Sequence, residues 1–523
     1  MPTLQELPVE LLLVIIAYLP LQSLHRFRRV SKFVDNVIHG NEELVYRQAA
    51  SLHAYVDGLD SVDPPRAERR SPTYPFTDAT SWKQYCQLCL DLNRNWVGQG
   101  SATPRTYCVQ NADVHRIKVD EERGLLFTSH ETGGIIVTDL ISGEILWTLP
   151  ENYVRTHAHL EYENGYLIFD RFDSDKEVWR LAADFHPSQT PPNASPDSPQ
   201  RVASLFAEAR YSNTSHGHLK PWALLTTTQP TFAYRFSYPT LIVMSMDTAY
   251  LWDIPSATLT QTIRDAEEPF THNDGDGDER STISYVDVSA HHLFICGWHE
   301  LRIINRSNGT LAMRIPSQPI FAITRILLSH ERRDAPMVIV PLKAQALPPP
   351  QPSALPFPSF VAAHVSRCGR HLVAMLADNR LLLVENFERV IRGELRIAEA
   401  ALEVNIALPV NAIFISVYLA YEFGRVGVVT TSGVYIFTLD ATEHLLIDPA
   451  IPPSRNSLSL GLIRPSPAAE SIPPQTSFRN LAAAYLPRLR NKHVLVNLSC
   501  LQMTATRLYL TWDRRRADIL EQA

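Results

Sequence analysis

The sequence predicts a multidomain protein in which a small all-α bundle and a linker helix precede a large all-β domain. Three observations predict this arrangement. Apolar side chains recur at helical spacing over residues 1–50, a second helical pattern lies near 80–94, and short β-rich runs alternate with turns over 101–523. The chain has 523 residues, which is more than one ordinary hydrophobic core organises, so several domains or one large repeat fold are expected.

The composition is that of an ordinary globular chain, with 45% hydrophobic residues, 20% charged residues and a formal net charge of −7. Binding to nucleic acid or to an anionic membrane usually depends on a basic surface, so this charge argues against both kinds of partner. The six cysteines are few for this length, and their spacing suggests no disulfide framework. We therefore expect an intracellular protein, in the cytoplasm and/or the nucleus.

The first predicted helix lies in LPVELLLVIIAYLP, residues 7–20, and runs from Pro8 to about Leu19. Proline suits the first position of a helix, and Glu10 suits the positive first turn. We do not expect the segment to be a signal peptide, because Met1–Glu6 contain no Lys or Arg, and it is too short to span a bilayer. A helix that is apolar nearly all round must be buried nearly all round.

The next segment can cover only one side of this helix. Leu21 and Leu24 recur at helical spacing, Ser31 can cap a further helix, and Gly40 can end it. Three short helices over about 45 residues form a core that is marginal alone. The other side of the first helix therefore needs another chain or a later domain.

Residues 4–48 resemble an F-box. The resemblance lies in the opening Leu7-Pro8-x-Glu10-Leu11, Ile15, Leu19-Pro20, Leu24, the run Arg29-Val30-Ser31-Lys32, and Tyr46. Phe33 departs from the pattern, since many members carry Trp there.

The F-box resemblance implies docking to a Skp-type adaptor and, through it, to a cullin–RING ubiquitin ligase. An apolar helix laid into a partner's groove would supply the missing cover. The adaptor-binding residues that it implies are Leu7, Pro8, Glu10, Leu11, Leu12, Ile15, Leu19, Pro20, Leu24 and Val30. The alternative is that the bundle packs only against its own chain.

Residues 51–100 are predicted to form a linker that contains one helix. Its first part, 58–80, is polar and rich in proline, and the helical pattern follows near 80–94. This helix resembles the one that joins F-boxes to WD-repeat propellers, through Trp82-Lys83, Tyr85 and Arg94-Asn95-Trp96. Cys86 and Cys89 form a lone C-x-x-C, which we interpret as two buried cysteines because zinc needs four ligands.

The β-rich region contains seven similar units, of which residues 114–149 are the clearest. Thr138-Asp139 ends one run, while Trp252-Asp253 and Trp512-Asp513 end two others. The region resembles a propeller of about seven degenerate WD-like blades, although six or eight remain possible. A large β-sandwich is the rival fold, but it would leave the repetition unexplained.

Insertions and ring closure complete the propeller prediction. Proline-rich insertions near 186–200, 335–358 and 451–475 are expected to be long, partly disordered loops. An early strand, Thr106–Gln110, could complete the last blade and close the ring.

No enzymatic motif stands out. The chain has no G-x-S-x-G, no phosphate-binding G-x-x-x-x-G-K-[ST] and no H-E-x-x-H. An acidic run from Asp274 resembles a calcium loop, but Glu279 and Tyr285 stand where such a loop needs Gly and Glu. We therefore predict no catalytic residues, no cofactor and no metal.

The resemblance implies the substrate-recognition subunit of an SCF-type ubiquitin ligase. The propeller would bind a target protein for ubiquitination and proteasomal degradation. Two alternatives stay open, namely an F-box scaffold that acts outside a ligase and a propeller enzyme. Arg116, Arg155, Arg235 and Arg302 lie near predicted strands, but the sequence does not place them on one face, so no target-binding residue is predicted.

Overall fold

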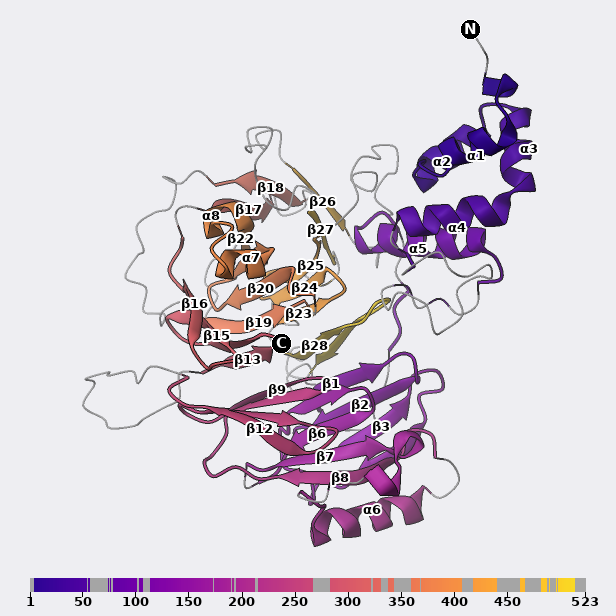
Figure 1. Ribbon diagram of the computed structural model, residues 1–523. Helices are drawn as coiled ribbons and strands as arrows, with labels where there is room; N and C mark the ends of the chain where they lie inside the picture. Colours follow the sequence, from indigo (N-terminus) through magenta and orange to yellow (C-terminus); the bar gives the residue numbers. More distant parts are fainter. Residues whose placement is uncertain are drawn as a thin grey trace, which may run out of the picture.

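The structure of the protein is a computed structural model in which a helical arm stands beside a ring of β-sheets (Figure 1). It describes residues 4–53, 55–56, 74, 76, 79–100, 103–106, 113–172, 174–189, 191, 194–211, 215–266, 283–320, 323–330, 337–342, 359–366, 368–406, 417–439, 461–465, 481–486, 489, 495 and 497–512. Within these residues, no helix is long and apolar enough to cross a membrane.

The described helices concentrate at the N-terminus, where five of them form the arm. These are α1 (Val9–Ile16), α2 (Leu21–Arg28), α3 (Lys32–Gly40), α4 (Glu42–Leu52) and α5 (Trp82–Trp96). The others, α6 (Ser198–Arg210), α7 (Phe387–Ile391) and α8 (Ile397–Ala400), interrupt the β-rich region. We propose that the domain boundaries lie near residues 50 and 100.

Prolines and one serine set the limits of the first helices. Pro8 and Pro20 lie immediately before α1 and α2, so α1 is shorter at both ends than the predicted Pro8–Leu19. The predicted cap at Ser31 is confirmed, because its side chain accepts a hydrogen bond from the Val34 backbone N–H at 3.2 Å and satisfies one free donor of α3. Gly40 is the last residue of α3, and α4 follows almost at once.

The β-rich region forms a propeller with six blades of four antiparallel strands among the described residues. The first three blades are β1–β4 (Val114–Asp120, Leu125–His130, Ile135–Asp139, Ile145–Leu149), β5–β8 (Leu160–Glu163, Tyr166–Asp170, Lys176–Leu181, Leu219–Leu225) and β9–β12 (Ala233–Ser237, Thr240–Met244, Ala249–Asp253, Thr258–Ile263). The next three are β13–β16 (Tyr285–Val288, His292–Cys296, Glu300–Asn305, Leu311–Pro316), β19–β22 (Phe360–Val365, His371–Leu376, Arg380–Glu385, Ala401–Ile406) and β23–β25 with β27 (Tyr418–Glu422, Arg425–Thr430, Gly433–Thr438, Ala482–Tyr485).

The predicted number of about seven blades is corrected to six. The seventh position holds a two-stranded sheet, β28 (Leu498–Met503) and β29 (Leu508–Trp512), between the innermost strands β23 and β1. The innermost strands therefore contact one another in the order β1, β5, β9, β13, β19, β23, β28 and back to β1. Of the predicted closing strand Thr106–Gln110, only Thr106 lies within the described residues, and it is not in a strand.

Two of the predicted loops contain strands. The insertion at 335–358 includes β18 (Met337–Pro341), and that at 451–475 includes β26 (Gly461–Pro465). β17 (Thr324–His330) pairs with β18 and runs parallel to β22, while β18 runs parallel to β26. These pairings join the fifth and sixth blades into one sheet of eleven strands.

The insertion at 186–200 also differs from the prediction, since its last residues begin α6. Asp197 accepts a hydrogen bond from the Gln200 backbone N–H at 2.9 Å, and the Gln200 side chain accepts one from the Asp197 backbone N–H at 3.2 Å. This reciprocal capping box, with Pro199 in the first turn, is a strong helix start. The prolines of this insertion predict a long, partly disordered loop, but residues 198–200 are helical.

The Asp residues of the repeated units close turns. Asp139 ends β3, and its carboxylate accepts hydrogen bonds from the backbone N–H groups of Ile141 at 2.8 Å and Ser142 at 2.6 Å. Asp253 ends β11 and accepts one from the Ser256 backbone N–H at 3.1 Å. An aspartate at the end of a third strand thus shapes the turn into the fourth.

Charged side chains of alternating sign line the inside of the ring. Glu161 on β5 lies 2.9 Å from Lys118 Nζ on β1 and 3.2 Å from an Arg235 nitrogen on β9. Asp287 on β13 continues the series, 3.7 Å from Arg235 Nε and 3.5 Å from His364 Nδ1 on β19. Ion pairs therefore join the inner strands of four neighbouring blades, and the contact of Asp287 with His364 extends the series to β19.

The second blade buries an acid that makes stability depend on pH. Glu177 on β7 accepts hydrogen bonds from Trp179 Nε1 at 2.8 Å and from the Tyr153 hydroxyl at 2.9 Å. Burial nevertheless raises the pKa of Glu177 from 4.5 to about 7. Folded Glu177 thus holds a proton that the unfolded chain releases, so this group's contribution to the unfolding free energy falls as the pH rises from 4.5 to about 7.

We expect Glu177→Gln to remove this pH-dependent component, because glutamine keeps the shape of the acid and does not titrate. Urea unfolding of wild type and Glu177→Gln, below pH 4.5 and above about pH 7, measures the pH-dependent part of the unfolding free energy. The exposed Glu122→Gln is the control. A wild-type contribution that rises with pH would contradict the assignment.

Candidate adaptor interface

The two faces of α1 differ in solvent exposure. Leu12 and Ile16 are fully buried in a cluster that also contains Leu24, Val34 and Ile38 of the next two helices. The opposite face carries large apolar side chains that remain exposed by 53% at Leu11, 57% at Val14, 46% at Ile15 and 76% at Tyr18. Such a contiguous apolar surface marks an interaction site.

The structure divides the ten predicted adaptor-binding residues by exposure. Pro8, Glu10, Leu11, Ile15 and Val30 are exposed, and Leu7, Leu19 and Pro20 are half-buried. Leu12 and Leu24 lie inside the bundle and offer no surface to a partner in this conformation. Contact of the ten residues with an adaptor stays a proposal.

Three exposed apolar residues in or just after α1 were missed from the sequence: Val9, Val14 and Tyr18. Val14 and Tyr18 follow Leu11 at i+3 and i+7 and so share its face, whereas Val9, two residues before Leu11, does not. The i, i+3, i+4, i+7 spacing of Leu11, Val14, Ile15 and Tyr18 is a signal that could have found two of them.

Charged residues lock the bundle behind this face. Arg28 on α2 lies 2.7 Å from Asp35 on α3 and 3.1 Å from Glu42 on α4, and Glu42 lies 2.7 Å from Lys83 on α5. Burial favours the neutral acid, but the hydrogen bonds and charges of Lys83 and Arg28 outweigh it and lower the pKa of Glu42. One acid thus joins the bundle to the linker helix.

The linker helix α5 packs tightly against the bundle. Ser81 caps it, and its Tyr85 hydroxyl donates to the Tyr55 carbonyl at 2.9 Å. Cys86 and Cys89 are both buried in this packing, and burial raises the pKa of the Cys86 thiol to about 12. The thiolate that a metal or a redox reaction needs is therefore disfavoured at neutral pH.

The other end of α5 is fixed to the propeller. Trp96 Nε1 donates to the Ala505 carbonyl at 3.0 Å, and Arg425 donates to the same carbonyl at 2.8 Å and to Asn93 Oδ1 at 3.2 Å. The Arg425 guanidinium lies 5.2 Å from the centre of the Trp96 ring. One hydrophobic cluster runs from α1 through α5 into β24, β25, β27 and β28. The arm and the propeller therefore form one continuous packed unit.

We expect Arg425→Met to loosen this junction. Burial lowers the pKa of Arg425 to about 10, and methionine keeps much of its apolar contact while removing the bonds to Ala505 and Asn93. The free energy that holds α5 against the propeller should fall by about 1–2 kcal/mol, and backbone amides of α5 should exchange faster. Hydrogen exchange measures it, and unchanged protection of α5 would contradict the proposed fixing role.

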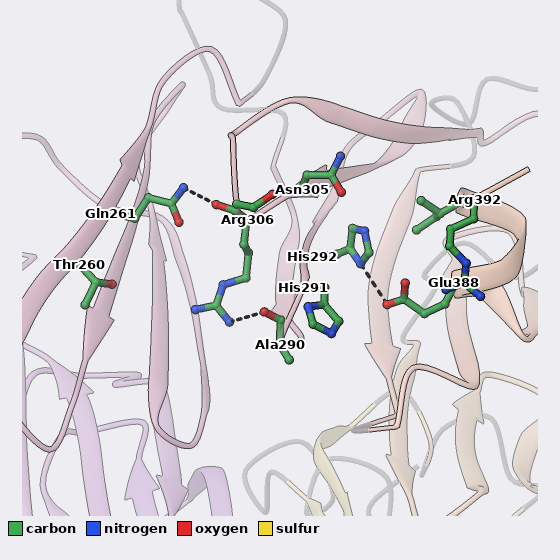
Figure 2. A pocket seen from close by; sticks show the side chains of 11 residues that line it. Thr260, Gln261, Ala290, His291, His292, Asn305, Arg306, Glu388 and Arg392 are labelled. Atoms are coloured by element: carbon green, nitrogen blue, oxygen red, sulfur yellow. Dashed lines mark hydrogen bonds and ion pairs between the residues drawn. The ribbon is translucent and has the colours of Figure 1, made fainter.

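A cavity of about 640 Å³ lies between the third, fourth and fifth blades (Figure 2). Its lining includes His292, which contacts Glu388 Oε1 at 3.1 Å, and Arg306, which donates to the carbonyls of Ser289 at 2.6 Å and Ala290 at 3.4 Å. These charged groups thus bond within the chain. We assign the cavity no ligand.

The arginines noted in the sequence do not gather into a free cluster. Arg116 donates to the Ser499 carbonyl, Arg155 pairs with Asp170, Arg235 belongs to the inner ring, and Arg302 donates to the Ala266 carbonyl. The acidic run that resembles a calcium loop lies mostly outside the described residues. In the part of the chain that is described, no three His, Cys, Asp or Glu side chains come together as metal ligands would.

Comparisons with known proteins identify a family for the N-terminal segment. Residues 4–34 match the F-box domain family. A search of curated proteins finds no match. Among solved structures, the chain is similar to the β-propeller domain of Myceliophteria thermophila Cps50 (Swd1), at 12% identity and a TM-score of 0.35, over 69% of this chain and 92% of that one.

Two further structures are similar at the same low level. For Kluyveromyces lactis Hsv2, the identity is 9% and the TM-score 0.31, over 64% of this chain and 95% of that one. For KlHsv2 with loop 6CD replaced by a Gly-Ser linker, the identity is 8% and the TM-score 0.36, over 64% and 81%. The propeller assignment follows from the strand order described above.

The chain thus has an F-box domain at its N-terminus and a six-bladed β-propeller behind it, as F-box/propeller proteins do. F-box domains in general bind Skp-type adaptors, and F-box proteins are typically non-catalytic. The combination fits the substrate receptors of SCF-type ligases in general.

Proposed function

We propose that this protein is the substrate-recognition subunit of an SCF-type ubiquitin ligase. The observation that carries the proposal is the exposed apolar face of α1, at Leu11, Val14, Ile15 and Tyr18, within the segment that matches the F-box domain. The outer face docks in the groove of a Skp-type adaptor, which brings the cullin and its RING partner. The propeller binds the target protein.

The protein contributes geometry and no bond chemistry. Because α5 is packed against both the F-box bundle and the propeller, a target on the propeller is held at a restricted distance from the adaptor. Restricting that distance raises the effective concentration of target lysines near the activated ubiquitin. The ubiquitinated target is then degraded by the proteasome. Neither nucleic acid nor a membrane has a part in this function.

The test compares cells that express wild type with cells that express Leu11→Glu/Ile15→Glu. We expect wild type to co-purify with the Skp-type adaptor and the cullin, and the variant to lose both. Propeller partners that bind both proteins should live longer in cells with the variant. Stable partners whose lifetimes do not change would instead support the scaffold alternative.

A further inference from the structure

Helix α6 turns its small side chains toward the propeller and its large apolar ones toward solvent, the reverse of an ordinary surface helix. The side chains that face the propeller are small: Ala203, Ser204 and Ala207 are buried against the outer strands β4 and β8. The large apolar side chains face outward, with exposed fractions of 46% at Val202, 66% at Leu205 and 74% at Phe206. Surface helices normally turn such side chains to the core.

The helix is nevertheless firmly anchored, so the exposure is not the result of loose packing. Asp197 caps its first turn and lies 2.7 Å from an Arg171 nitrogen on the loop after β6. Gln200 Nε2 donates to the Ala223 carbonyl of β8 at 3.2 Å. The Ser204 hydroxyl donates to Glu208 Oε1 at 2.9 Å, and Lys220 Nζ on β8 lies 2.5 Å from the same oxygen. The chain thus fixes an apolar stripe in one orientation.

The exposed face also has a definite charge. Besides the apolar stripe, the exposed residues of α6 are Ser198, Pro199, Arg201, Ala209 and Arg210. The one acid of the helix, Glu208, has a side chain that is 36% exposed, and Lys220 pairs with it. Two cations flank the stripe, one near each end of the helix. A complementary surface is therefore apolar in the middle and carries carboxylates at its sides.

We propose that this stripe, Val202, Leu205 and Phe206 with Arg201 and Arg210, docks an amphipathic helix of the target protein that bears acidic residues beside its apolar face. The i, i+3, i+4 spacing of the stripe forms a ridge that fits between the side chains of another helix. The formal net charge of −7 disfavours an anionic lipid surface as the occupant.

The position of α6 suits a target site. It lies on the outside of β8, at the end of the molecule remote from α1 and α2 (Figure 1). A helix bound there and an adaptor bound at α1 do not compete for surface. The inference deepens the proposed receptor function and depends on it only for the statement that the partner is a target.

The test uses the full chain and two synthetic helical peptides of about 18 residues. Both carry leucines at helical spacing, one with glutamates and the other with lysines on the flanks. Anisotropy titrations should show that the glutamate peptide binds wild type about tenfold more tightly than the lysine peptide does. Leu205→Ser/Phe206→Ser should weaken this binding about tenfold or more. Arg201→Glu/Arg210→Glu should reverse the preference between the peptides.

The matched control is Ile141→Ser, which removes a side chain that is 76% exposed on the first blade and should change nothing. Thermal melting checks that each variant folds, as expected for exposed positions. Equal binding of both peptides, or no effect of Leu205→Ser/Phe206→Ser, would overturn the proposal.

Other partners of the α6 stripe would give different experimental results. Co-sedimentation with phosphatidylcholine vesicles that contain about one fifth phosphatidylserine, lost in Leu205→Ser/Phe206→Ser, would assign the stripe to a lipid surface and overturn the proposal. Self-association of wild type, lost in the same variant, would assign it to a second copy with the same consequence. Adaptor binding is measured on every sample. If the adaptor fails to bind while the glutamate peptide binds, the receptor function fails and the docking site stands.

Discussion

Leu11→Glu/Ile15→Glu is expected to weaken binding of a purified Skp-type adaptor by about a hundredfold or more. Both side chains lie on the exposed face of α1, where each would bury an apolar surface worth about 1.5–3 kcal/mol against a partner. Two glutamates remove that gain and add charges that a groove would have to desolvate. Titration calorimetry with the full chain measures the effect.

Two further variants separate docking from folding. Ile141→Glu places a charge at an exposed apolar position on the propeller and should leave adaptor affinity unchanged. Leu12→Ala removes a buried side chain and should lower the unfolding free energy of the chain by about 2–5 kcal/mol. If Leu11→Glu/Ile15→Glu melted early as Leu12→Ala does, its loss of binding would no longer identify the outer face as the interface.

Glu161→Gln should lower the unfolding free energy of the propeller by about 3–5 kcal/mol. Glu161 is almost fully buried, and Lys118 and Arg235 both lie against its carboxylate. Burial opposes the charge, but these two cations outweigh it and lower the pKa of Glu161 well below its usual value. Glutamine leaves Lys118 without its counter-charge, and Arg235 keeps only the more distant Asp287. Urea unfolding measures the change.

A double variant tests the electrostatic cause. Adding Lys118→Met removes a buried cation that has lost its counter-charge. Glu161→Gln/Lys118→Met should therefore be more stable than Glu161→Gln alone. The exposed Glu122→Gln serves as the control for the loss of one acid. If the double variant were less stable than the sum of the single changes predicts, ion pairing would not be the reason for the loss.

Local patterns predicted much of the arm. Prolines at Pro8 and Pro20, the cap at Ser31 and the spacing of Leu21 and Leu24 act within one or two turns, so they can be identified from the sequence. The face of α1 that points outward could not be identified from the composition of the helix, because it is apolar nearly all round. Only the packing of Leu12 and Ile16 against α2 and α3 settles it.

The propeller was predicted as a repeat, but its details depend on contacts distant in sequence. Turn-closing aspartates such as Asp139 and Asp253 follow the repeat closely. The parallel pairing of β18 with β26 joins segments more than a hundred residues apart and has no local signal. Helix α6 did have one, the capping box at Asp197 and Gln200, but the neighbouring prolines favoured the loop interpretation.

The measurement that tests the central claim most directly is hydrogen exchange of the full chain with and without a purified Skp-type adaptor. The account predicts saturable protection of residues 9–18 when the adaptor is added, with little change in the propeller and in α6. No binding, or protection confined to the propeller while α1 exchanges as in the free chain, would contradict it.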